Sequence, residues 1–74
     1  MTVREIALIY SDLVVAEGKI PVEEHHAKDQ INALRTKYHE LLMAKMREEG
    51  IEFSDRFDAA QKGFEIARRP ADKS

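Results

Sequence analysis

The sequence predicts an all-α domain of three helices, with a shorter first helix, a long central helix and a third helix that folds back. Helix start and stop residues divide the chain at two places, around residues 18–21 and 50–54. Apolar residues recur at alternating spacings of three and four in the second and third segments, the helical period. Charged residues make up 35% and hydrophobic residues 43% of the chain, a balance typical of folded soluble proteins rather than disordered ones.

The first segment has a signal for each helix end. Thr2 and Glu5 have the spacing of a capping box, in which each side chain bonds the other residue's backbone amide. Gly18 suits the left-handed position after a helix end, so we expect the helix to stop there. A short buried strand over Ile6–Tyr10 is the alternative, because short apolar runs are ambiguous. The cap and the glycine favour the helix.

The second segment contains no glycine or proline between Pro21 and Gly50. Proline suits the first helical turn, so the helix is expected to begin at Pro21 or Val22. Residues 22–49 would then form one helix of about 42 Å at 1.5 Å per residue. Its apolar residues form a row with coiled-coil-like spacing: Ala27, Ile31, Leu34, Tyr38 and Leu41.

The third segment is expected to begin at an N-cap, Ser54, and to stop at Pro70, with a frayed tail over 71–74. Residues 1–70 thus form a single helical domain. Five residues are predicted to share one buried face: Phe53, Phe57, Ala60, Phe64 and Ala67. Met43 and Met46 are interpreted as core residues as well.

The first helix leads to the main prediction, self-association. Between Ile6 and Ala16 only Ser11 and Asp12 are polar, and a helix that is apolar nearly all round is normally buried. Two other helices can cover only part of it, and a chain of 74 residues without cysteine has a marginal core. We therefore predict a homodimer, with an interface formed by Ile6, Leu8, Ile9, Tyr10, Leu13, Val15, Ile31, Leu34 and Tyr38.

The same apolar run is neither a signal peptide nor a membrane span by its pattern. Glu5 follows Arg4 directly and Asp12 interrupts the run, which is shorter than the roughly 20 residues that a membrane span needs. The expectation is a mature cytoplasmic protein with no membrane association. Asp12 has two interpretations, a buried functional acid or the solvated edge of the helix, and the second is favoured because buried aspartates are rare.

One stretch resembles the zinc motif HExxH at four of its five positions. His39 and Glu40 match, but Met43 stands where the second imidazole should be and cannot replace it on zinc. We interpret the match as incidental, with His39 and Glu40 on the solvated side of the helix. His25 and Asp29 lie one turn apart, but two ligands make only an adventitious metal site. No metal and no cofactor are predicted.

Neither catalysis nor nucleic-acid binding has a clear signature. No nucleophile pattern or glycine-rich phosphate loop occurs, so the chain is predicted not to be an enzyme. The net charge of −2 lacks the basic excess of a DNA-binding domain, and acidic residues interleave with Arg35, Lys37, Lys45 and Arg47. The favoured function is a non-enzymatic protein-interaction module, a regulator or accessory subunit with an unidentified protein partner. The alternative is a nucleic-acid-associated regulator that binds as a dimer.

Overall fold

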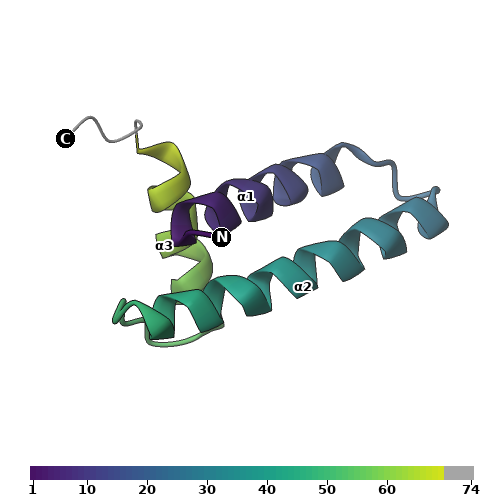
Figure 1. The fold of residues 1–74 in the computed structure, drawn as a ribbon. Coiled ribbons are helices and arrows are strands. Elements are labelled where there is room, and N and C mark those ends of the chain that lie inside the picture. The colour runs from purple at the N-terminus through teal and green to yellow at the C-terminus, as the bar shows by residue number, and fades with distance from the viewer. Residues whose placement is uncertain (70–74) are drawn as a thin grey trace.

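The computed structural model describes residues 1–69, and three helices packed together make up the fold. α1 (Val3–Lys19) and α2 (His25–Glu48) run antiparallel as a hairpin, and α3 (Arg56–Arg68) crosses one end of it (Figure 1). That end holds the start of α1 and the end of α2. The dimensions are 44 × 26 × 19 Å, and the radius of gyration of 13.1 Å exceeds the roughly 11 Å expected for a compact chain of this length.

α1 confirms the predicted start and corrects the predicted end. The Thr2 amide donates to Glu5 Oε1 over 2.7 Å, and the Glu5 amide donates to Thr2 Oγ1 over 3.1 Å, a complete capping box. Gly18 lies inside the helix, so its predicted left-handed role is wrong. The helix ends at Ile20, which is extended at φ −84° and ψ 127°. The residue before a proline is forced out of the helical region, so Pro21 sets this end.

α2 begins later than predicted. Residues 21–24 form a turn instead, closed by a 3.0 Å hydrogen bond from the Glu24 amide to the Pro21 carbonyl. The short connection must reverse the chain direction, and this turn uses residues that would otherwise start the helix. At the other end Gly50 adopts φ +76°, and the Ile51 amide bonds the Met46 carbonyl over 2.8 Å. This Schellman pattern, in which glycine takes the left-handed position, ends α2.

α3 begins after Asp55, not Ser54 as predicted. Asp55 accepts from the Asp58 amide over 2.8 Å, while Asp58 accepts from the Ser54 amide over 2.9 Å. The predicted phenylalanine face is confirmed in part: Ala60 is buried, and Phe53, Phe64 and Ala67 pack against the core, but Phe57 does not. Phe53 precedes the helix and Phe57 is 78% exposed, whereas the buried row consists of Ala59, Ala60 and Gly63. These small residues let α3 approach closely. Pro70 and the 71–74 tail lie outside the described residues.

The core lies at the end of the hairpin that α3 crosses. Tyr10 is its aromatic centre, with its ring 5.6 Å from the Phe64 ring and 5.1 Å from the His39 ring. The segment Ile6–Tyr10 is helical, so the strand alternative is wrong. The buried hydrophobic residues are Ile6, Ala7, Tyr10, Leu42, Met43, Met46, Ala59 and Ala60. The core role predicted for Met43 and Met46 is confirmed.

Candidate interaction surface

Burial is distributed unevenly along the hairpin. On α1 the buried residues end at Tyr10, and on α2 they begin at His39. No residue from 11 to 38 is buried, although the structure describes all of them. We call residues 11–38 the open half of the hairpin. It consists of two helical arms that extend past the point where α3 crosses the hairpin (Figure 1), and Val14 and Tyr38, at the inner ends of the arms, pack against the core.

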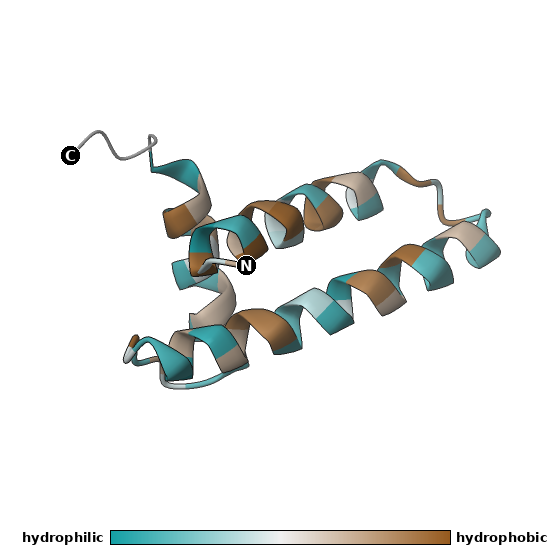
Figure 2. Cartoon of the chain, viewed as in Figure 1, coloured by the Kyte–Doolittle hydropathy of each residue, from teal (hydrophilic) through white to brown (hydrophobic). Residues whose placement is uncertain are grey.

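The open half is rich in apolar residues despite this exposure. Figure 2 shows hydrophobic segments along both arms, well past the point where α3 crosses. Val15 is 54% exposed and Leu34 46% exposed. The other apolar residues of this half, all exposed or half-buried, are Leu13, Val14, Ala16, Ile20, Val22, Ala27, Ile31, Ala33 and Tyr38. Exposed apolar residues that share one side of a molecule usually mark a site of interaction, so the question is which of these residues lie together.

The α2 row predicted from the sequence lies at the edge of the hairpin rather than in its core. Leu34 and Leu41, seven positions apart, are 46% and 39% exposed. Ile31 and Tyr38, also seven positions apart, are half-buried. The residues that pack in the core come from a neighbouring row of the helix, which runs through His39, Leu42, Met43 and Met46. Leu34 and Leu41 are therefore available to a partner helix, whereas Tyr38 also packs against the core of its own chain.

One flank of α1 lies on the same side as this row. A groove of about 300 Å³ at the α3 end is lined by Ile6 from α1 and by Leu41 and Lys45 from α2, with no residue of α3. α3 instead approaches α2 on the side of Glu40, which pairs with Arg56 over 2.9 Å. At about 100° per residue, α1 continues around the Ile6 flank through Ile9, Leu13 and Ala16. We define the hairpin face as these three residues together with Ala27, Ile31, Leu34, Tyr38 and Leu41.

The structure divides the predicted interface residues into three groups. Ile6 and Tyr10 are buried in the core of this chain, 5% and 3% exposed, and so are not available to a partner. Leu8 and Val15 lie on the outer flank of α1, about half a turn away from the core. The remaining five belong to the hairpin face: Ile9, Leu13, Ile31, Leu34 and Tyr38.

Within the open half two polar contacts join the two arms. Arg35 Nε lies 2.6 Å from Glu17 Oε1, and Lys28 Nζ donates to the Glu17 carbonyl over 3.0 Å. The Arg35 and Glu17 side chains are 30% and 23% exposed, so solvent screens the pair. Such pairs contribute only about 0.2–1 kcal/mol. These polar contacts therefore add little to the stability of the hairpin compared with the buried core at the end that α3 crosses.

The HExxH-like stretch has a structural role that the sequence analysis did not predict. His39 is buried, 8% exposed, so its predicted solvated position is wrong, whereas Glu40 is exposed as predicted. His39 Nε2 lies 3.0 Å from the Arg56 carbonyl oxygen. A carbonyl can only accept, so Nε2 carries the proton and donates. His39 therefore joins α2 to the first turn of α3.

The signal for this role was present in the sequence. Leu42, Met43 and Met46 form the densest apolar cluster of α2, and His39 lies three and four positions before the first two. Residues at those spacings share a helix face. The prediction followed the longer Ala27–Leu41 row instead, which placed His39 on the outside.

No constellation for metal chemistry is present in residues 1–69. No three histidine, aspartate or glutamate side chains in this part of the chain gather closely enough to hold an ion. His25, His26 and Asp29 are exposed at the start of α2, where His26 Nε2 only approaches Gln30 Nε2 at 3.4 Å. Asp12 is exposed too, which confirms its interpretation as the solvated edge of the first helix.

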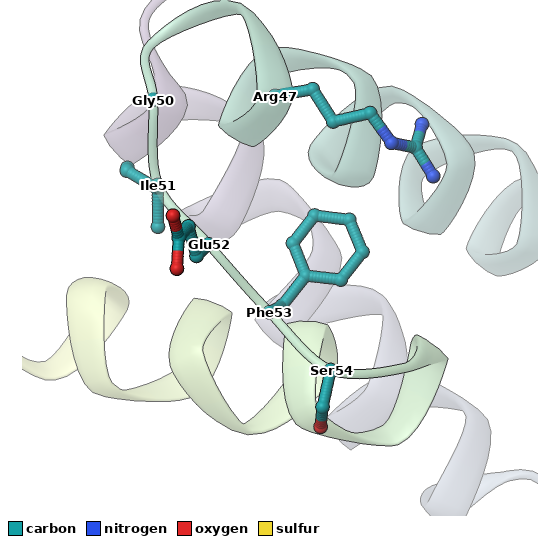
Figure 3. A pocket seen from close by; sticks show the side chains of 6 residues that line it. All are labelled: Arg47, Gly50, Ile51, Glu52, Phe53 and Ser54. Atoms are coloured by element: carbon teal, nitrogen blue, oxygen red, sulfur yellow. The ribbon is translucent and has the colours of Figure 1, made fainter.

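A surface cleft of about 600 Å³ lies at the turn between α2 and α3. Arg47 stacks on the Phe53 ring at 5.3 Å from its centroid, and Glu52 and Ser54 line the opening (Figure 3). The cleft is open and the only basic group on it is occupied by the ring. Its residues fix the turn that leads into α3, and no convergent set of polar groups points to a ligand.

Most of the basic residues considered for nucleic-acid binding have a partner within the chain. Arg35 pairs with Glu17, Arg47 stacks on Phe53, and Lys45 pairs with Glu48 over 2.9 Å. The hydrogen bond to Glu48 raises the pKa of Lys45 and the same bond lowers the pKa of Glu48. Of the four positions, only Lys37 has neither an ion-pair partner nor an aromatic ring beneath it among the described residues.

Comparisons with known proteins leave the surface itself as the guide to function. No family model matches the chain, and no curated protein or solved structure shows significant similarity to it. Within residues 1–69, none of the helices combines the length and the apolar character needed to cross a bilayer.

Proposed function

We propose that this chain is a small non-enzymatic interaction module, a regulator or accessory subunit, that self-associates through the hairpin face. The observation that supports this is the open half, where an apolar row with heptad spacing has no buried residue between positions 11 and 38. Helices with such a row bury it against another helix. A second protein would then bind surface that remains exposed in the dimer, with Leu8 and Val15 on the outer flank of α1 as the apolar candidates.

The hairpin face extends along α2 from Ala27 to Leu41, which is about 21 Å at 1.5 Å per residue. It covers about half of the 44 Å length of the molecule, so the dimer that it supports belongs to the smaller class of interfaces.

The mass of the chain in solution tests the proposal. Size exclusion with light scattering at micromolar concentration should give twice the chain mass of 8.5 kDa. Leu34→Lys should shift the protein to monomer. Leu34 is 46% exposed, so a charge is tolerated there in the free chain, but it would be buried without a partner between two packed helices. Phe57→Lys is the matched control, since Phe57 is more exposed but lies on α3, and it should remain a dimer. A monomeric parent chain would overturn the proposal.

Nucleic-acid binding by the dimer is the weaker candidate, because it rests on Lys37 as the main unpaired basic residue of the row considered. Titration with duplex DNA at low salt tests it. Affinity that falls steeply with added salt would support it, and no binding at low salt would exclude it.

A further inference from the structure

The hairpin face carries information about how two copies would fit, which rests on the proposed function and makes it more specific. Two identical chains that share one patch are related by a two-fold axis, so each contact occurs twice. α2 supplies the longest continuous row on the face, with Leu34 at its middle position. The row can pair with its copy in a parallel or an antiparallel sense, and the two choices oppose different residues.

We infer that α2 packs antiparallel against α2 of a second copy, with the two-fold axis at Leu34. Leu34 then meets its own copy, Ile31 lies opposite Tyr38, and Ala27 lies opposite Leu41. Each of the outer pairs joins a smaller side chain with a larger one, which fills the space between two helices evenly. In a parallel pair Ala27 would face Ala27 and Tyr38 would face Tyr38. The two small side chains would leave a gap between the helices, and the two large ones would force the helices apart.

Charge favours the same arrangement. Beyond Leu41 the next position of the row is Lys45, and the antiparallel register places it opposite Glu24, the residue that precedes α2. Opposite charges at the two ends of the interface therefore meet twice. The parallel register would place Lys45 against its own copy, and like charges at such positions are destabilising.

The position of the axis also fits the distribution of burial. Leu34 lies within the open half, so an axis there places the open half of each copy over that of the other. The two α3 helices, which approach α2 from the Glu40 side, stay at opposite ends and outside the interface. The open half of each hairpin, which α3 does not cover, would then be covered by the hairpin of the partner.

Cysteine cross-linking tests this register, because the chain has no cysteine of its own. Leu34→Cys should form a disulfide-linked dimer under mild oxidation, since residues on the axis lie within the Cα separation of about 5.5–6 Å that a disulfide needs. Thr36→Cys is the matched control, exposed and nearby but on the opposite flank of α2. With a millimolar effective concentration inside the dimer and a micromolar chain concentration in solution, Leu34→Cys should cross-link roughly a thousandfold faster than Thr36→Cys.

Two off-axis variants complete the test. Ala27→Cys alone should not cross-link, but its mixture with Leu41→Cys should give a covalent heterodimer. If light scattering shows a dimer and Ala27→Cys links to itself, the pairing is parallel and the inferred register is wrong, while the proposed self-association stands. If light scattering shows a monomer, the proposed function and the register fail together. A dimer with no cross-link at Leu34 also overturns the register.

Discussion

The packing of α3 on α2 predicts that Gly63→Ala destabilises the protein. A Cβ on Gly63 would lie 2.6 Å from Leu42 Cδ2, well inside the 3.4–4 Å of ordinary contact. Leu42 is completely buried, so its side chain has no solvent-facing space into which it can move. The alanine would therefore push α3 away from α2 or force Leu42 from its rotamer.

Two opposing effects set the magnitude. Replacing a helical glycine by alanine gains about 1 kcal/mol in helix propensity. Overpacking a core costs about 1–3 kcal/mol. We therefore expect the free energy of unfolding to fall by about 1 kcal/mol, which lowers the Tm of a chain this size by roughly 4–8 °C.

Gly18→Ala is the control, because it gains the same helix propensity as Gly63→Ala but brings no new atom into contact with Leu42. Nothing lies within 4 Å of a Cβ built on Gly18, which is inside α1, so this variant should raise the Tm. Circular dichroism melts at one fixed chain concentration measure both, since self-association would make the Tm depend on concentration. A Gly63→Ala variant that gains as much stability as Gly18→Ala would refute the close approach of α3. A destabilised Gly18→Ala would refute the helical position of Gly18.

Other variants test the remaining contacts. His39→Ala should lower the unfolding free energy by about 2 kcal/mol in urea titrations, because it leaves a cavity beside Tyr10 and an unpaired Arg56 carbonyl. Hydrogen bonds from Lys62 and the Ser54 amide lower the pKa of Asp58. The contribution of the Asp58 carboxylate to the free energy of unfolding is therefore complete near neutral pH and is lost as the pH falls below about 4. The Tm of Asp58→Asn should fall less steeply with acid than the Tm of the parent chain. Phe57→Ser should change stability by less than about 0.5 kcal/mol in the same titrations, since that side chain is 78% exposed.

Helix number and type followed from local chemistry. The capping box at Thr2 and Glu5 and the glycine at position 50 act within a few residues, so their effects can be predicted from the sequence. Three helix boundaries were misplaced, the start of α2 and two others at which a nearby signal competed with the chosen one. Pro21 overrides Gly18 at the end of α1, and Asp55 caps α3 although Ser54 offers a similar side chain.

The faces of the helices were harder to predict than the helices themselves. The phenylalanine stripe of the third segment has the right spacing, yet the buried row consists of Ala59, Ala60 and Gly63. Hydrophobicity favours the large residues, but close approach to Leu42 requires small ones. The outcome depends on the distance between two helices, which no single segment encodes.

α2 shows why the sequence could nevertheless predict apolar surface that the single chain leaves exposed. It carries two apolar rows, one through Leu42, Met43 and Met46 and another from Ala27 to Leu41. A helix can turn only one of them fully toward α1 and α3, and the shorter, denser row is the one buried. The longer row extends over the part of α2 that α3 does not reach. Helix spacing is retained along that whole length, so under the proposed self-association a second α2 with the matching period would cover the exposed part of this row.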